Sequence, residues 1–179
     1  MAISTFDGPV RSLGGMFQQG PASVVTLTAS KTLNPTDHAG RIISVGGSLA
    51  STTTLTLPTI NTSANPVTSG PGQDPNTVNN LGVTYTIWVP TTVATSSLKI
   101  GTDGTDKYIG TIFGIDTDSS NALVAYTAAS TNDFINFNGG TTGGVAGTWV
   151  RIFAIAANKY MVDGIALGTG TVATPFADS

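Results

Sequence analysis

The sequence predicts an all-β protein, built as a single antiparallel β-sandwich or jelly-roll-like barrel with an extended N-terminal arm. Three observations support this fold class. The 179 residues include 30 Thr and no Glu, only 9% are charged, and short runs of alternating apolar and polar residues recur along the chain. Solvent-facing helices need Glu, Lys and Arg, so this composition argues against helical bundles and doubly wound α/β folds. The hydrophobic content of 40% is too high for a disordered chain.

The first 22 residues show neither a period of two nor one of 3.6, and they contain Pro9, Gly14 and Pro21. We interpret residues 1–22 as the arm and residues 23–179 as the β-sandwich domain. Apolar side chains in such an arm are costly to leave in water, which favours docking on another chain. The alternative is that the arm folds back over its own domain. The candidate contact residues are Arg11, Leu13, Met16 and Phe17.

Alternation with a period of two predicts about ten strands. Threonine suits them because its β-branched side chain fits the pleat while its hydroxyl faces water. Residues 34–40 are predicted as a turn, and residues 61–81 as a long exposed loop that is either a contact surface or a tolerated insertion. The predicted strands lie at 25–28, 43–45, 54–57, 83–89, 98–100, 108–115, 123–127, 134–137, 148–156 and 160–166.

The run 149–156 differs from the others because both of its faces are apolar. Trp149, Phe153 and Ile155 share one face with Arg151, and four further apolar residues form the other. A sandwich strand needs only one buried face, so the second must meet a loop, the arm or a neighbouring subunit. We assign Trp149, Phe153 and Ile155 to the core and a subunit interface.

Charge and cysteine content narrow the possible functions. A net charge of −3 and a pI near 4.7 leave no basic stripe for phosphates, so we expect no nucleic-acid partner. The absence of Cys excludes disulfides, thiolate catalysis and Cys-ligated zinc. We expect no secretory signal and no membrane partner, because no apolar run approaches the length of either kind of segment.

Catalytic and ligand-binding motifs are sparse. His38 is the single histidine and is predicted to lie solvated in a turn, which leaves little basis for a catalytic triad or a histidine metal site. The Asp-rich segments 103–106 and 116–121 resemble calcium loops in their oxygen content but read better as β-turns. The Gly-rich segment 139–144 also reads as a turn, because no Lys follows it as in a phosphate-binding loop. We therefore expect no enzyme activity, no cofactor and no metal.

Two stretches resemble β-domains found in structural proteins of tailed bacteriophages. They are SVVTLTASKTLNPTDHAGRIISV, followed by TTLTLP, and GGTTGGVAGTWVRIFAIAANKYMVDG. Together they span most of residues 23–166, and no catalytic residue comes with the resemblance. It implies a capsid decoration (cement) protein, made in the bacterial host cytoplasm, that binds the major capsid protein on the outer surface of the virion as a homotrimer. The alternative is a head-fibre or tail-spike domain that binds a host receptor or glycan through exposed aromatics such as Trp88.

Overall fold

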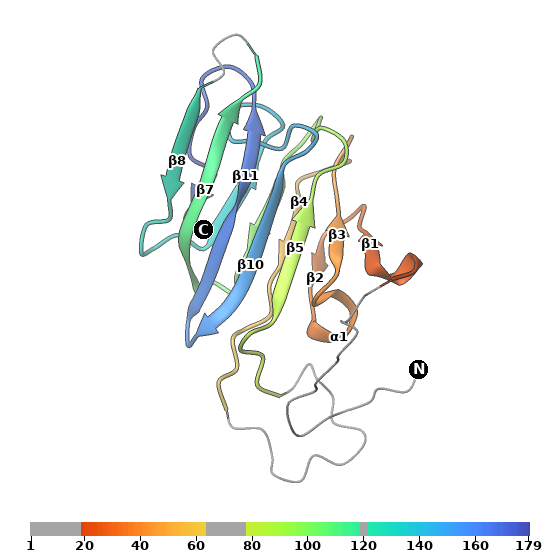
Figure 1. Ribbon diagram of the computed structural model, residues 1–179, viewed down its shortest axis with the longest axis vertical. Helices are drawn as coiled ribbons and strands as arrows, with labels where there is room; N and C mark the ends of the chain where they lie inside the picture. Colours follow the sequence, from red (N-terminus) through yellow and green to blue (C-terminus); the bar gives the residue numbers. More distant parts are fainter. Residues whose placement is uncertain (1–18, 64–77, 119–121) are drawn as a thin grey trace, which may run out of the picture.

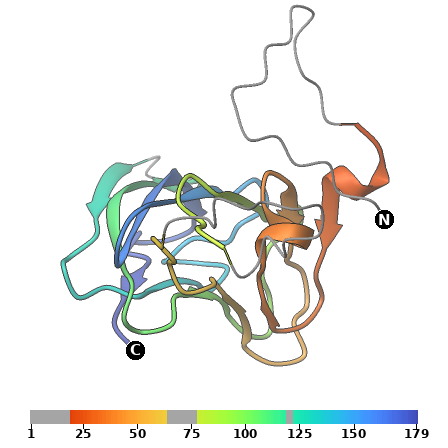
Figure 2. The ribbon, with the colours of Figure 1, turned by 90° about the horizontal axis from the view of Figure 1, so that it is seen from below.

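The computed structural model describes residues 19–63, 78–118 and 122–179, which form two β-sheets packed face to face (Figures 1 and 2). The all-β sandwich predicted from the sequence is therefore confirmed. The strands are β1 (Val24–Thr26), β2 (Lys31–Thr32), β3 (Ile42–Ser44), β4 (Thr53–Thr56), β5 (Thr84–Trp88), β6 (Leu98–Gly101), β7 (Lys107–Asp116), β8 (Leu123–Thr127), β9 (Phe134–Phe137), β10 (Trp149–Ala156), β11 (Lys159–Gly168) and β12 (Phe176–Ala177).

The strand order shows how the chain builds the two layers. One sheet has seven strands in the order β1-β3-β5-β10-β11-β7-β8, and the other has five in the order β12-β9-β6-β4-β2. Over its first six strands the chain passes from one sheet to the other at every connection. Each strand therefore lies beside the strand two places before it, and these neighbours run in the same direction.

This alternation corrects the expectation of an antiparallel sandwich. Five pairings between the described strands are parallel, namely those named above and the long pair β7 and β11. The other five are antiparallel. The period-two pattern did not reveal this, because residue alternation records which face is buried and not the direction of the neighbouring strand.

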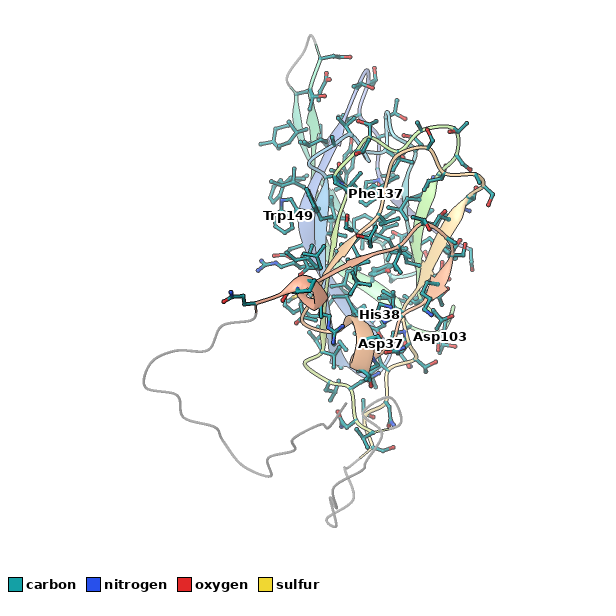
Figure 3. The ribbon with its side chains drawn as sticks, turned by 90° about the vertical axis from the view of Figure 1, so that its right-hand side faces the viewer. Asp37, His38, Asp103, Phe137 and Trp149 are labelled. Atoms are coloured by element: carbon teal, nitrogen blue, oxygen red, sulfur yellow. The ribbon has the colours of Figure 1, made fainter. Side chains whose placement is uncertain are left out.

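The core lies between the two sheets and takes every second residue of each long strand. Tyr85, Tyr108 and Tyr160 from the large sheet are fully buried there. Phe137 from the small sheet is also fully buried (Figure 3). Two of the tyrosines complete their hydrogen bonding with backbone carbonyls: Tyr108 Oη donates to Ile100 O at 3.1 Å, and Tyr160 Oη donates to Pro58 O at 2.5 Å. These bonds tie the large-sheet strands to the small-sheet side of the core.

The predicted turn at 34–40 contains one turn of helix, α1 (Pro35–His38). The Asn34 side chain caps it by accepting from the Asp37 N–H at 2.8 Å, and Pro35 occupies its first turn. His38 is only 2% exposed, so the expectation of a solvated histidine was wrong. Its Nδ1 accepts from the Asn34 N–H at 3.1 Å, and burial lowers its pKa. It is a structural residue that holds the turn.

A 3₁₀ turn, η1 (Pro21–Ser23), precedes β1 at the end of the predicted arm. Residues 1–18 of the arm and residues 64–77 of the predicted loop lie outside the described residues. No helix in the described parts of the chain is long and apolar enough to cross a membrane.

Candidate functional site

Strand β10 presents one face to the core and the other to solvent. Val150, Ile152 and Ala154 point inward and are buried, as expected for one side of an alternating strand. Trp149 projects away from the sandwich, on the opposite side of the sheet from the core residue Phe137 (Figure 3). Ile155 is 43% exposed. Among the described residues, neither a loop nor the small sheet covers this side of β10 in Figure 1.

The registers of the neighbouring strands extend this side into a broad surface, which we call the outer face. The first row across it consists of direct cross-strand partners: Trp88, Trp149, Ile165 and Phe113. Neighbouring strands lie about 4.7–4.9 Å apart, so the four side chains form a continuous apolar row. We call this the tryptophan row. Trp88 is 40% exposed and Phe113 is 46% exposed.

A second apolar row crosses the same face near the other end of β10. It joins Phe153, Met161 and Ile109, which are also direct cross-strand partners. We call this the methionine row. Met161 is 38% exposed. At the sheet edge, Leu123 of β8 extends the apolar surface and is 65% exposed.

A polar row runs between the two apolar rows, formed by Thr86, Arg151, Asp163, Thr111 and Thr127. Arg151 donates from Nε and Nη2 to the two carboxylate oxygens of Asp163, at 3.2 and 2.5 Å. The carboxylate raises the pKa of the guanidinium. Thr111 and Thr127 share a hydrogen bond at 3.2 Å between their hydroxyls.

Arg151 also lies against the aromatic rings on either side of it. Its Cζ atom is 5.6 Å from the centre of the Trp149 ring and 5.7 Å from that of Phe153. Both distances lie within the range of cation–π attraction. The polar row is therefore linked to both apolar rows, and the outer face is an ordered surface whose central charges are paired.

The sequence assigned Trp149, Phe153 and Ile155 to the core and a subunit interface. The core part was wrong, because the other side of β10 faces the core and none of the three is among its buried residues. The structure brings Trp149 and Phe153 together through Arg151. The predicted capsid-contact residues Arg11, Leu13, Met16 and Phe17 lie outside the described residues. Sequence reasoning missed Phe113, Met161 and Ile165, because the order of strands is needed to see that they share a face with Trp149. The alternation in 108–115 and 160–166 showed which residues share a face of each strand. It did not show that these two strands lie beside β10.

The Asp-rich turn after β7 borders a pocket of about 370 Å³, which is lined by Asp116, Asp118, Ala122, Val124, Gly170, Thr171 and Val172. Asp116 Oδ1 accepts from the Asp118 N–H at 3.0 Å, and Asp118 Oδ2 accepts from the Gly170 N–H at 2.7 Å. Both carboxylates therefore hold loop backbone, as the turn interpretation expected. The neighbouring residues 119–121 are not described.

The Asp-rich turn at 103–106 is organised in the same way. Asp103 Oδ1 accepts from the N–H groups of Thr105 and Asp106 at 2.9 Å each. Asp106 is fully buried, and its Oδ2 accepts from the Ile60 N–H at 2.9 Å, whereas its Oδ1 has no hydrogen-bond partner. Burial raises the pKa of Asp106, and the charge of Asp103 adds to this effect.

Two further carboxylates, those of Asp133 and Asp163, lie in different sheets and are not brought together. Asp163 lies on the outer face, whereas Asp133 precedes β9 in the small sheet. Asp133 accepts from Lys107 Nζ at 2.9 Å and from the backbone N–H and hydroxyl of Ser179 at 2.8 and 3.0 Å. Burial opposes its ionisation, but these hydrogen bonds outweigh burial and lower the pKa of Asp133.

Within the described ranges, no cluster of three or more His, Cys, Asp or Glu side chains is placed to hold a metal ion. Comparison of the chain with protein-family models, characterised proteins and solved structures finds no match. We take the outer face as the candidate functional site, because strand register brings its aromatic and charged side chains together on one surface.

Proposed function

We propose that the chain is a structural protein of a tailed-phage particle, a decoration or cement protein that binds the major capsid protein on the outer surface of the head as a homotrimer and stabilises the shell. The observation that supports this proposal is the outer face. Exposed apolar surface on this scale is unusual for a protein that acts alone, and it is typical of proteins that work in assemblies. The resemblance of residues 23–166 to phage β-domains suggests that this assembly is a phage particle.

The proposed mechanism is multivalent binding. A contact of about 4 kcal/mol alone corresponds to millimolar affinity, but three such contacts on one trimer raise the effective concentration of the second and third. The bound trimer stabilises the shell by mass action, because it binds the assembled lattice better than loose subunits. In this proposal Arg11, Leu13, Met16 and Phe17 contact the shell, and Trp149, Phe153 and Ile155 contribute to the interface between subunits.

A second candidate function is glycan or receptor binding by a head-fibre or tail-spike domain. It is favoured by Trp88, which is 40% exposed and is the cross-strand partner of Trp149. Aromatic rings of this kind stack on sugars. Against it, the guanidinium of Arg151 already lies over the rings of Trp149 and Phe153, so a sugar must displace it to stack on either ring.

The test is immunogold labelling of particles released from a bacterium that carries the coding sequence, using antibodies raised against the purified chain. The proposal predicts gold on the outside of the head. Gold confined to the tail, or particles without gold, would contradict it. Addition of purified Phe17→Ala chain to particles lacking the protein then tests the arm, because the proposal predicts weaker head binding than that of the unaltered chain.

A glycan array with the purified chain tests the second candidate. Specific binding that is lost in Trp88→Ala, with no label on heads, would support the fibre or spike role over decoration.

A further inference from the structure

We infer that the outer face is covered by the outer faces of the other copies in the proposed trimer, and that Arg151 and Asp163 set the register in which the copies meet. This inference deepens the proposed function, on which it rests for the existence of an oligomer. The proposed function places only Trp149, Phe153 and Ile155 at the interface between subunits. The inference extends this interface to the whole outer face and assigns its alignment to Arg151 and Asp163.

The size of the outer face suits a contact between copies. The seven strands of the large sheet are three to ten residues long. With strands about 4.8 Å apart and a rise of about 3.3 Å per residue, they span on the order of 700 Å². A stable protein interface buries about 800 Å² on each partner. The outer side of the large sheet is therefore of the size that a contact with another copy needs.

The composition of the outer face resembles the core of an interface. Its two apolar rows contain both tryptophans of the chain, two phenylalanines and Met161, residue types that are enriched in interface cores. The charges at its centre are one cation and one anion, already paired. Such a face offers no excess charge to a strongly acidic or basic partner.

Self-complementarity then favours a second copy as the occupant. Arg151 and Asp163 are direct cross-strand neighbours, so around the threefold axis of the proposed trimer each copy can present its carboxylate to the guanidinium of the next copy. A register that sets this ion pair against an apolar row of the other copy buries both charges with no polar partner across the contact, and their desolvation is then not compensated. The hydroxyls of Thr86, Thr111 and Thr127 lie in the same row and can complete the hydrogen bonding.

The exposure of the pair makes it a usable probe. The Arg151 side chain is 48% exposed and that of Asp163 is 44% exposed, so neither is needed to fill the core. Arg151→Asp gives a face with two negative charges at its centre, and Asp163→Arg gives one with two positive charges. Lys99→Asp is the matched control, because Lys99 projects from the small sheet and carries the same change of charge.

The experiment measures molecular mass by sedimentation equilibrium over a dilution series, for the full chain and each variant, with circular dichroism as the check of folding. We expect the unaltered chain and Lys99→Asp to form the same oligomer. Each face variant alone should dissociate at least about 10-fold more readily, because like charges face each other across the contact. An equimolar mixture of Arg151→Asp and Asp163→Arg should recover assembly.

Three results would overturn the inference: a monomeric unaltered chain at all concentrations, face variants that assemble like the unaltered chain, or a mixture of folded variants that does not recover assembly. Should either variant fail to fold, Phe113→Lys provides the second test with Leu81→Lys as its control, since both positions are exposed and only Phe113 is on the outer face. An oligomer that does not label phage heads would contradict the proposed function and leave this inference standing. A monomer that labels heads would contradict this inference and the proposed trimer, and would leave only the proposed location on the head standing.

Discussion

Trp88 of β5 and Trp149 of β10 are direct cross-strand partners on the outer face, and they are the only two tryptophans in the chain. The strand that carries Trp149 buries Val150 and Ile152 completely on its other side. The large sheet therefore has two apolar faces, one that forms the core of the sandwich and one that the described residues leave in solvent. Substitutions on the two faces should therefore have different effects on the free energy of unfolding.

Ile152→Ala should lower the free energy of unfolding by about 2–5 kcal/mol, because Ile152 is fully buried and the substitution leaves a cavity. Ile155→Ala, on the same strand but 43% exposed, should change it by no more than about 0.5 kcal/mol. Urea unfolding at low protein concentration, where copies are separated, measures both. Equal losses for the two variants would contradict the assignment of the core to one side of β10.

Gly110→Ala should be far more destabilising than Gly104→Ala. Both glycines have positive φ, +110° and +87°, so each substitution carries a backbone cost of about 1–2 kcal/mol. At Gly110, however, a Cβ would lie 2.1 Å from the Val162 carbonyl oxygen on β11, whereas nothing lies within 4 Å at Gly104. Thermal unfolding compares the two variants, and similar melting temperatures would count against the close pairing of β7 with β11.

Asp133→Asn should destabilise the protein by about 1–3 kcal/mol at neutral pH, because it weakens the hydrogen bonds from Lys107 and Ser179 to a buried group. The folded-state pKa of Asp133 is lowered, so its contribution is present above the unfolded pKa of about 3.9 and is lost as the pH falls through the folded pKa. The gap between variant and unaltered chain should therefore close in acid. Urea unfolding at pH 7 and pH 3 tests this, with the exposed Asp178→Asn as control. A gap of the same size at both pH values would refute it.

Asp106 should have the opposite effect on pH dependence. Its folded-state pKa is raised by burial, so its carboxyl favours the folded state most below the unfolded pKa of about 3.9, and this contribution falls as the pH rises through the folded pKa. Asp106→Asn keeps an oxygen to accept from the Ile60 N–H and removes the titration. The difference in free energy of unfolding between the two proteins should then shift in favour of the variant from pH 4 to pH 7, and a constant difference would exclude the effect.

The strands of this fold were largely predictable from the sequence, and their arrangement was not. Alternation located the ten longer strands, because a half-buried strand imposes a period of two on its residues. It missed β2 and β12, which are two residues long and too short to show a period. The parallel pairings arise because the chain alternates between the two sheets. The alternation of apolar and polar residues does not indicate which sheet the next strand joins.

The candidate site was predictable only in part, for the same reason. Apolar residues on both faces of 149–156 indicated a surface beyond the core. The pairing of Arg151 with Asp163 depends on the register of β10 with β11, which leaves no mark on the sequence of either strand. The burial of His38 could not be predicted from its neighbours in the sequence, because a residue in a turn is normally solvated. In the structure His38 is buried and accepts a hydrogen bond from the N–H of Asn34, the residue that caps α1.

Tryptophan fluorescence tests the central claim most directly, because both indoles report on the outer face and on nothing else. The measurement is the emission maximum and acrylamide quenching of the full chain over a dilution series at neutral pH. If copies cover the outer face, emission shifts to shorter wavelength and quenching falls as concentration rises, and Arg151→Asp removes both changes at the same concentrations. Emission typical of solvated indole that stays constant from the lowest to the highest concentration would contradict the account.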